Sequence, residues 1–328
     1  MVRSINRREF GSLAGGATLA ALAAPRAFAQ QFPNKFIRIV SPAPPGGGTD
    51  IIARGVQPHL QALLGQPVIV ENKGGGGGYL GVEYTSKSPA DGYTICVSGA
   101  FAIITASLHK VPGYDPRKDI KPLAVVGSVP NMLVAGKTMK ASSVKELIEY
   151  AKANPGKVNM GSNGVGTSLH LSGELFQLRT GTKFTHVPYR GWADCMAAVS
   201  TGEVDIMFDN ASTSIPKIKA GNVRPFAICA PARHRDLPDV ATLTELGVKD
   251  ADVISWFGLI MPAGVPNDIA AVLDKAIAEI AKKPEFQKTI HEQGLDNTYS
   301  PMKEAGDLWN KEVDKWQAVI KAADVKAE

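Results

Sequence analysis

The stretch FIRIVSPAPPGGGTDIIARGVQPHLQALLGQPVIV, residues 36–70, decides the fold because it contains a complete strand, loop, helix and strand. Residues 36–40 form a short apolar run, which is typical of a buried strand. Residues 49–64 carry apolar side chains at spacings near three and four and are followed by Gly65, which predicts a helix. A second strand is predicted at residues 67–70. This order predicts an α/β protein whose parallel strands are joined by right-handed crossovers.

The same alternation continues toward the C-terminus. Pro130 separates two apolar runs, so two strands are expected around it. The further predicted strands are residues 93–98, 123–127, 132–135, 157–160, 185–187, 204–208, 224–230 and 256–261. The further predicted helices are residues 79–86, 143–154, 167–180, 193–201, 212–220, 267–281 and 302–321.

The length of the chain predicts two lobes. At 328 residues it is longer than one hydrophobic core usually supports. Each lobe is expected to be a mainly parallel sheet flanked by helices, with crossings between the lobes near residues 129–133 and 253–258. The first lobe is then discontinuous and combines residues 30–130 with 257–328, while residues 131–256 form the second.

The N-terminal segment has the pattern of an export signal. Arg7 and Arg8 precede an Ala/Gly-rich apolar run at residues 11–24 and an A-x-A-like site that ends at Ala29. We therefore expect a twin-arginine signal peptide over residues 1–29, cleavage before Gln30, and a periplasmic protein. The alternatives are the general secretory route, or an N-terminal helix of a cytosolic protein.

Charge argues against nucleic acid as a partner. The whole chain has a formal net charge of +5, and loss of Arg3, Arg7, Arg8, Arg26 and Glu9 with the signal removes a net +3 and leaves +2. The sequence contains no long run of Lys or Arg, so binding to nucleic acid is not expected. No later segment approaches the roughly 18 apolar residues of a membrane span, so a soluble, unanchored monomer is expected.

The cysteine and histidine patterns indicate neither thiol chemistry nor a metal site. Cys96, Cys195 and Cys229 are an odd number, so at least one is unpaired within the chain. Cys96 and Cys229 lie in apolar runs and are expected to be small buried residues. The six histidines show no metal-ligand spacing, and neither G-x-S-x-G nor H-E-x-x-H occurs. No catalytic set, metal or cofactor is predicted.

Three glycine-rich loops, residues 44–50, 72–78 and 161–168, each stand between a predicted strand and a predicted helix. The first N–H groups of a helix have no internal partner and carry the positive end of the helix dipole, so such loops can bind an anion. Thr49 or Asp50 can also cap its helix. The alternative for any one loop is a tight turn with a helix cap. Three of them at the carboxyl ends of strands favour a ligand cleft, with the first two on one lobe and the third on the other.

Two nucleotide-binding motifs are not supported. Gly76-x-Gly78-x-x-Gly81 matches a dinucleotide fingerprint, but the next predicted strand, residues 93–98, ends without the required acidic residue. The first loop lacks Gly-Lys-Ser/Thr and is therefore not a P-loop.

Several other side chains have both a binding and a structural interpretation. Arg190 can clamp a carboxylate, or it can be a surface arginine stacked on a neighbouring aromatic ring. Asp209 can accept from a ligand, or it can cap the helix that starts near Ser212. His170 is interpreted as structural because it lies in an amphipathic stretch, and Trp256 is expected to pack at a junction between lobes.

These features together resemble the Bug-type receptors of tripartite tricarboxylate transporters, over nearly the whole chain after the signal. The motifs that carry the resemblance are Pro42-x-Pro44-Pro45-Gly46-Gly47-Gly48-Thr49-Asp50, Val70-Glu71-Asn72-Lys73-Gly74, Pro89-Ala90-Asp91-Gly92-Tyr93-Thr94, Val187-Pro188-Tyr189-Arg190-Gly191 and Gly202-Glu203-Val204-Asp205-Ile206-Met207-Phe208-Asp209. The resemblance implies a two-lobed periplasmic-binding-protein fold, type II-like. It also implies a receptor that closes on a small organic carboxylate and delivers it to integral-membrane permease subunits.

The resemblance also implies which residues contact the ligand. One lobe contributes the first loop and the glycine run, and the other contributes the third loop and an acid at a strand end. The ligand-binding residues predicted in this way are Pro45, Gly46, Gly47, Thr49, Asp50, Gly77, Gly78, Ser162, Gly166, Thr167, Ser168, Tyr189 and Asp209.

Two positions depart from the family pattern. Tyr79 and Trp192 stand where small residues are common in the family, and both are expected to add aromatic surface near the cleft. They suggest a ligand with a flat or apolar body. Two other functions fit the same architecture: an exported hydrolase that acts on a small acid, and a sensory subunit that reports the ligand to a membrane kinase.

Overall fold

The structure is a computed structural model that describes residues 32–108, 113–189 and 191–326. From Lys35 onward these residues belong to one compact unit. The expected signal peptide, residues 1–29, and Arg190 lie outside the described residues.

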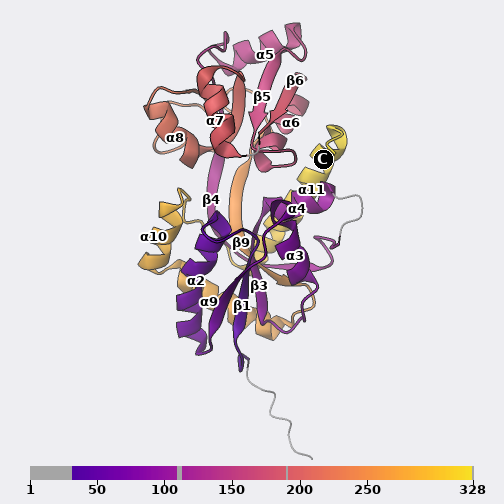
Figure 1. Cartoon of the computed structure of the whole chain (residues 1–328), viewed down its shortest axis with the longest axis vertical. Coiled ribbons are helices and arrows are strands. Elements are labelled where there is room, and N and C mark those ends of the chain that lie inside the picture. Colours follow the sequence, from indigo (N-terminus) through magenta and orange to yellow (C-terminus); the bar gives the residue numbers. More distant parts are fainter. Residues whose placement is uncertain (1–31, 109–112, 190, 327–328) are drawn as a thin grey trace, which may run out of the picture. The chain divides into compact units, whose positions relative to one another are not determined.

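Three parallel strands form one end of a continuous mixed sheet, drawn in the lower part of Figure 1. They are followed by two antiparallel strands, in the order β2-β1-β3-β9-β4. The strands are β1 (Ile37–Ser41), β2 (Val68–Asn72), β3 (Thr94–Gly99), β9 (Ile254–Pro262) and β4 (Ile120–Ala135). The helices of this half are α2 (Gly48–Leu64), α3 (Tyr79–Ser86), α4 (Ala100–Leu108), α9 (Asn267–Ala281), α10 (Pro284–Glu292) and α11 (Met302–Ala322), with a short 3-10 turn, η2 (Gly76–Gly78), before α3.

The other half of the sheet repeats this plan in the upper part of Figure 1. Three strands are parallel, in the order β7-β5-β6, and the far part of β4 runs antiparallel to β7 and β8. The strands are β5 (Val158–Ser162), β6 (Phe184–Pro188), β7 (Ile206–Asn210) and β8 (Arg224–Cys229). The helices are α5 (Val144–Ala153), α6 (Ser168–Thr180), α7 (Trp192–Thr201) and α8 (Ala211–Lys219).

The two halves share β4, which is one strand of 16 residues and not the two strands predicted on either side of Pro130. Residues Ile120–Pro130 pair with β9, and Asn131–Ala135 pair with β7 and β8. Proline removes one backbone donor, but β4 changes partner immediately after Pro130, so the ladder loses little there. The side chain of the fully buried Asn131 then bonds to Ser172 (2.9 Å) and Ser255 (3.0 Å) and anchors this turning point.

Two helices were not predicted from the sequence, α4 and α10. The segment of α4, AFAIITASL, is apolar almost all round, so it shows no helical period. Its residues Ala102, Ile103 and Ile104 are fully buried, which explains the missing polar face. Helix α10 is short and begins with Pro284 at its first position, a usual place for proline.

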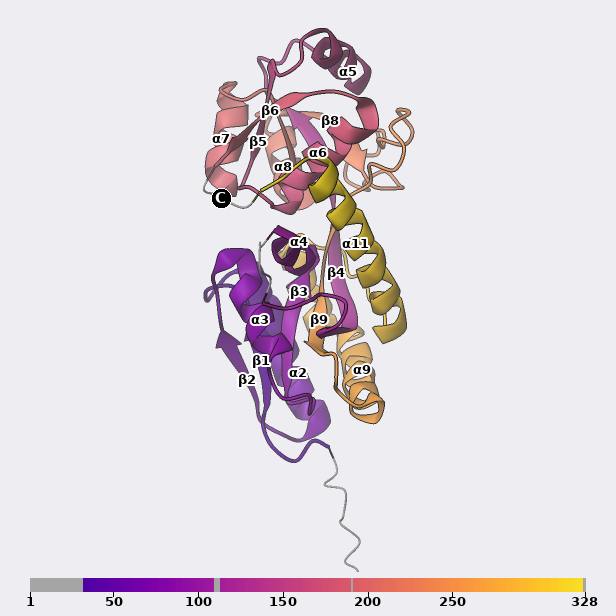
Figure 2. The ribbon, with the colours of Figure 1, turned by 90° about the vertical axis from the view of Figure 1, so that its right-hand side faces the viewer.

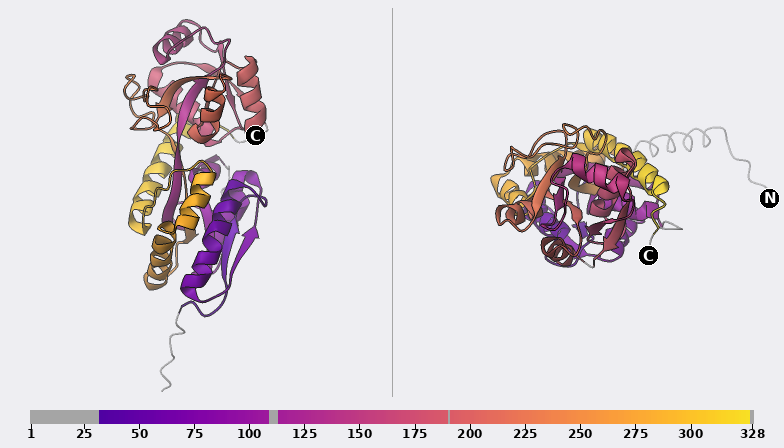
Figure 3. Two further views of the ribbon diagram at one scale, coloured as in Figure 1. Left: turned by 90° about the vertical axis from the view of Figure 1, so that its left-hand side faces the viewer. Right: turned by 90° about the horizontal axis from the view of Figure 1, so that it is seen from above.

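The core consists of two large clusters of buried apolar side chains, one mainly in each half. The first includes Trp309 and Trp316 of α11, and the second includes Phe176 and Phe208. Figures 2 and 3 show α11 running beside β4. Helix α11 therefore supports the long strand that both halves use.

The cysteines are buried, as the sequence analysis predicted for two of them. Cys96 and Cys229 are fully buried, as predicted, and so is Cys195; all three thiols are free. Burial raises the pKa of Cys96 and of Cys195 to about 12. Each thiol is therefore protonated at neutral pH and acts as a small apolar group.

Membrane-spanning helices and metal-binding clusters are absent from the part of the chain that the structure describes. Across residues 32–108, 113–189 and 191–326, no helix combines the length and the apolar character that crossing a membrane requires. In the same part of the chain no three His, Cys, Asp or Glu side chains cluster in a way that could hold a metal ion.

Candidate ligand-binding site

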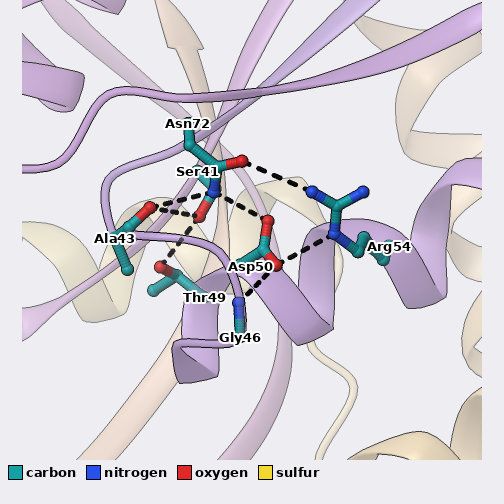
Figure 4. Close-up of polar contacts among 7 residues, drawn as sticks. All are labelled: Ser41, Ala43, Gly46, Thr49, Asp50, Arg54 and Asn72. Atoms are coloured by element: carbon teal, nitrogen blue, oxygen red, sulfur yellow. Dashed lines mark hydrogen bonds and ion pairs between the residues drawn. The ribbon is translucent and has the colours of Figure 1, made fainter.

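The first glycine-rich loop is held in place by the buried carboxylate of Asp50 (Figure 4). Its Oδ2 accepts from the backbone N–H of Gly46 and from Nε of Arg54, each at 2.9 Å, and its Oδ1 accepts from Nδ2 of Asn72 at 2.7 Å. Burial by itself would raise the pKa of Asp50, but these hydrogen bonds and the charge of Arg54 hold the pKa below its ordinary value. Asp50 is therefore an ionised internal brace between the loop and β2.

Neither Thr49 nor Asp50 caps α2 in the way that the sequence suggested. The N-cap of α2 is Gly47, and no side-chain capping hydrogen bond is made there. Thr49 is 8% exposed, and its hydroxyl lies 3.3 Å from Ser41 Oγ. Asn72 Nδ2 also donates to the Ala43 carbonyl at 2.9 Å. Side chains thus tie down the loop, and its exposed tip, which includes Pro45 and Gly46, is left to face solvent.

The glycine run of the second loop is required by the backbone. Gly75, Gly76, Gly77 and Gly78 all have positive φ, between 57° and 127°, a region that residues with a side chain rarely adopt. A Cβ on Gly78 would lie 2.6 Å from the Phe101 ring of α4. The run therefore folds into a tight turn, η2, packed on α4, and it presents backbone where other loops would present side chains.

Tyr79 does not add aromatic surface to a cleft, which corrects the expectation from the sequence. It is 6% exposed, its ring lies 5.3 Å from the Tyr114 ring between centroids, and its hydroxyl accepts from the Gly113 N–H. The reason is that Tyr79 starts α3 with its side chain turned into the core, away from the glycine turn.

The third loop is a closed hydrogen-bonded unit at the start of α6. Thr167 is the N-cap; its Oγ1 accepts from His170 N at 3.3 Å and donates to the Gly164 carbonyl at 2.9 Å. Gly166, at φ 73°, donates its N–H to His170 Nδ1 at 3.1 Å. The Oγ of Ser162 is 2.7 Å from His186 Nε2. These bonds fix the loop around the N-terminus of α6.

Two stacked histidines lie beneath this loop. The rings of His170 and His186 are 3.7 Å apart between centroids. Burial, and then the neighbouring His170, lower the pKa of His186 to about 4, so His186 is neutral at physiological pH. His170 is 4% exposed and supports the loop, which confirms its structural interpretation.

The second and third loops face each other across a cavity of about 370 Å³. Four predicted ligand-binding residues line it: Gly77, Gly166, Thr167 and Ser168. The other lining residues were not predicted: Gly76, Phe101, Thr105, Leu108, Asn163 and Val165. Among the described residues, none with a charged side chain lines this cavity. Gly76, Asn163 and Val165 lie in the predicted glycine-rich loops, so the sequence could have indicated them as lining residues. It could not indicate Phe101, Thr105 and Leu108, because α4 was not predicted.

The two halves touch beside this cavity, at Gly166 and Leu108. A Cβ on Gly166 would lie 2.1 Å from Leu108 Cδ1, so α4 packs directly on the third loop. Asn163 has a buried Oδ1 without a hydrogen-bond partner among the described residues. The first-loop residues Pro45 to Asp50 are not among the described residues that line this cavity.

Asp209, at the end of β7, is a fully buried carboxylate with an uneven environment. Its Oδ2 accepts from Trp192 Nε1 (3.0 Å), Thr213 Oγ1 (2.9 Å) and Ser214 Oγ (2.6 Å). Its Oδ1 has no partner among the described residues. Burial raises the pKa of Asp209, although the three donors oppose this. The N-cap of α8 is Asn210 and makes no side-chain cap, so Asp209 binds first-turn hydroxyl groups and does not occupy the cap position.

Trp192 and Tyr189 each use their polar group in a contact within the protein. The Trp192 indole is occupied by its bond to Asp209, and its ring lines a separate cavity of about 190 Å³. Tyr189 is partly buried and donates to Glu203 Oε1 at 3.1 Å; partial burial and then Glu203 raise its pKa to about 12.

Comparisons with known proteins agree with this architecture. The sequence profile described as "Tripartite tricarboxylate transporter family receptor" matches residues 52–325. Protein BugT of Bordetella pertussis is 34% identical over 309 residues, which cover 94% of this chain and 94% of BugT.

Two solved structures with ligands are also similar. An R. palustris protein with adipate has a TM-score of 0.73 at 31% identity, and the match covers 90% of this chain and 99% of that protein. MatC from Rhodopseudomonas palustris with bound malate has a TM-score of 0.71 at 27% identity, over 88% of this chain and 100% of MatC. The match over residues 52–325 and the 34% identity to BugT confirm the resemblance seen in the sequence: this chain belongs to the family of tripartite tricarboxylate transporter receptors and has their two-lobed α/β fold.

Proposed function

We propose that this receptor captures a small organic carboxylate in the cavity between the second and third loops. The observation that carries the proposal is the cavity itself, in which the N-terminus of α6 and the positive-φ backbone of Gly76 and Gly77 face each other. The similar R. palustris structures hold adipate and malate, which are dicarboxylates. An anion can be held here by backbone dipoles and hydroxyl groups, without a countercharge from a side chain.

Within the cavity, each wall has a separate task. The first turn of α6 presents N–H groups without helical partners, and Ser168 adds a hydroxyl. Thr167 is already occupied as the N-cap, so its role is to hold these donors in place. On the opposite wall Phe101 and Leu108 of α4 are apolar, and Val165 of the third loop adds apolar surface beside α6. We therefore propose a ligand with one carboxylate at α6 and an apolar carbon body that packs on these three residues. They provide the apolar surface that was expected from Tyr79.

We propose that closure of two lobes completes the ligand shell. The lobes we infer are residues 30–130 with 257–328, and 131–256, joined where β4 changes partner after Pro130 and where β9 begins. Each lobe contributes one loop to the cavity, so only the closed arrangement supplies both walls. Of the other predicted contacts, Pro45, Gly46, Gly47, Thr49, Asp50 and Gly78 belong to the loops of the first lobe, and Ser162, Tyr189 and Asp209 to the second.

Delivery and location follow from family membership. The receptor is proposed to hand its ligand, chemically unchanged, to the permease subunits of a tripartite transporter in the cytoplasmic membrane. Export by a twin-arginine signal with cleavage after Ala29 is part of this proposal. Cell fractionation and N-terminal sequencing of the mature protein test both points, since a cytoplasmic, uncleaved product would contradict them.

The first test of binding is a thermal-shift panel with adipate, malate, benzoate and the neutral analogue adipamide. A ligand that binds the native state raises the unfolding midpoint as its concentration increases. At least one acid is expected to do so, and adipamide is not. No shift with any acid, or an equal shift with adipamide, would contradict carboxylate capture. Nuclear magnetic resonance of the recovered ligand should show it unaltered; conversion would favour the hydrolase.

The placement of the ligand is tested with a matched pair at Thr105. This residue lines the cavity, and its Cγ2 lies 3.4 Å from where a Cβ on Gly77 would stand. Thr105→Asp puts a negative charge next to the bound anion and should weaken the affinity about tenfold or more. Thr105→Asn has the same shape without the charge and should bind within about threefold of the native protein. Equal affinities in the two variants would show that the ligand does not bind in this cavity.

A further inference from the structure

A second and larger cavity, of about 550 Å³, lies beside the strands that join the two halves. It is lined by β4 and β9 residues, by α11, and by the end of α6 with the loop before β9. Figure 2 shows α11 passing beside β4, with α6 close to the upper part of α11. Its volume is within the range of about 300–1,000 Å³ that is usual for small-molecule sites. It shares no lining residue with the cleft between the glycine loops.

Two buried polar atoms on the walls of this cavity lack partners. Trp256 is only 6% exposed, and its indole Nε1 has no hydrogen-bond partner among the described residues. The Oδ1 atom of Asp252 is also buried and without a described partner. Leaving a buried donor or acceptor unpaired is unfavourable, and most such groups in native proteins find a partner. A ligand that carries both an acceptor and a donor group could satisfy these two atoms.

Some charged groups around the cavity already satisfy each other. Lys315 Nζ donates to the Asp252 carbonyl at 2.8 Å and lies 3.4 Å from Glu312 Oε1. Glu312 Oε2 accepts from Trp316 Nε1 at 2.7 Å. Lys315 and Glu312 therefore form part of the wall and have little capacity left for a ligand.

Besides Arg179, whose Nε donates to the Asp250 carbonyl, three charged groups on the wall remain available. Within the described part of the chain, the carboxylates of Asp250 and Asp252 and the ammonium of Lys311 form no ion pair with one another or with a neighbour. Burial, and to a lesser degree the charge of Asp250, raise the pKa of Asp252, while Lys315 and Lys311 oppose this. A cation placed between the two carboxylates would relieve their repulsion.

The backbone conformation of Asp250 is also unusual. Asp250 has φ 55°, one of two non-glycine residues in the left-handed region among those described. Its carbonyl accepts from Arg179 Nε at 3.1 Å, which holds the turn against the end of α6. Sparsely populated backbone conformations of this kind are often found at ligand sites. Here the conformation sets the Asp250 side chain on the cavity wall beside Asp252.

We propose that this cavity is a second binding site, for a small zwitterionic amino acid with an apolar side chain. The ligand ammonium would lie between Asp250 and Asp252, and the ligand carboxylate would accept from the Trp256 indole and Lys311. The apolar side chain would pack on Val125, Ile254 and Leu308, which also line the cavity. Both charges of the ligand are needed, because the wall presents unpaired groups of both signs.

Such a site would be coupled to the cleft. Asp250 and Asp252 precede β9 on the side of the second lobe, whereas Lys311 and Leu308 belong to α11 on the side of the first. A relative rotation of the lobes changes the distance between these walls. A ligand in this second cavity, which we call the hinge cavity, therefore favours one lobe arrangement. Its binding changes the affinity of the cleft for the cleft ligand, and binding in the cleft changes the affinity of the hinge cavity by the same factor.

The test uses L-leucine and two fragments of it on the mature protein. The fragments are 4-methylpentanoate, which lacks the ammonium, and 3-methylbutylamine, which lacks the carboxylate. Titration calorimetry should show saturable binding of leucine, with each fragment at least about tenfold weaker. No saturation by leucine up to about 10 mM, or equal binding of either fragment, would overturn the proposal.

Variants then assign the site. Trp256→Phe keeps the ring that packs edge-on against Trp309 at 6.0 Å but removes the N–H, and Asp252→Asn keeps the shape but removes the charge. Each should weaken leucine binding about fivefold or more, and so should the exposed Lys311→Met, which should not disturb folding. The control is Lys145→Met on α5, which removes an exposed ammonium that does not line this cavity and should leave the leucine affinity unchanged. If the hinge variants bind leucine normally, or if Lys145→Met weakens leucine binding as much as they do, the hinge site is wrong while carboxylate capture in the cleft stands.

Discussion

Asp50, in the first turn of α2, and Asp209, near the end of β7, are both buried carboxylates, yet their pKa values move in opposite directions. Asp50 has donors on both oxygens, and one of them is the cation Arg54. Asp209 has three neutral donors, all on Oδ2. Burial favours the neutral acid at both sites, so the arrangement of donors decides the outcome.

The difference indicates what each carboxylate does. A carboxylate that is satisfied on both oxygens, such as Asp50, has nothing left for a ligand and acts as part of the scaffold of its loop. Asp209 retains an oxygen without a described partner, so a donor on a ligand or a water molecule would lower its energy. Of the two, Asp209 is the carboxylate whose hydrogen bonding is incomplete among the described residues.

The largest effect is expected from Asp50→Ala. It leaves the Gly46 N–H, the Asn72 amide and Arg54 without their common partner, and should lower the free energy of unfolding by about 3 kcal/mol. Urea denaturation measures this. Arg54→Ala is the control, because Arg54 is half exposed and screened by solvent, so its loss should lower the free energy of unfolding clearly less. A loss below about 1 kcal/mol for Asp50→Ala would contradict its role as a brace.

Trp192→Phe should have a smaller effect. It removes one of three donors to Asp209 Oδ2 while it keeps most of the ring, and should lower the free energy of unfolding by about 1 kcal/mol. It should also raise the pKa of Asp209 further, which carboxyl chemical shifts followed against pH would show. An unchanged titration would mean that the indole does not stabilise the ionised form.

Asp209→Asn is expected to change stability by less than about 1 kcal/mol at pH 7, in the direction of greater stability. The amide keeps an acceptor for the three donors and removes a charge that burial disfavours. The matched Asp50→Asn should instead destabilise, because it takes away the charge that Arg54 pairs with. Urea midpoints of the two variants therefore move in opposite directions, and movement in the same direction would refute the comparison.

The pH dependence gives the finest discrimination between the two carboxylates. Asp50 has a folded-state pKa below 3.8, so its contribution to stability is complete above that pH and is lost as the pH falls through the folded pKa. Asp209 has a folded-state pKa above 3.8, so its contribution is complete below 3.8 and is lost as the pH rises through the folded pKa. On acidification, the stability difference between the native protein and Asp50→Asn should shrink. The difference between the native protein and Asp209→Asn should also shrink, but it should do so at a higher pH because the pKa of Asp209 is raised.

Local patterns in the chain predicted much of the fold. Residues 79–86 and 267–281 are helices with the predicted limits, because periodic apolar positions and their end signals are local. The predictions failed where an element is buried on all sides, as α4 is, or where a partner change permits proline inside a strand, as in β4. Neither condition is visible within a short window of sequence.

By itself, the sequence of this protein determined the three glycine loops and their order along parallel strands, because positive-φ turns and strand–helix units depend on neighbouring residues alone. Only the tertiary structure decided which loops share a cavity, that Phe101, Thr105 and Leu108 form its other wall, and that Tyr79 is in the core. It also decided which buried carboxylate stays charged. These outcomes depend on contacts between segments far apart in the chain, where distance, burial and the number of donors set the free energy.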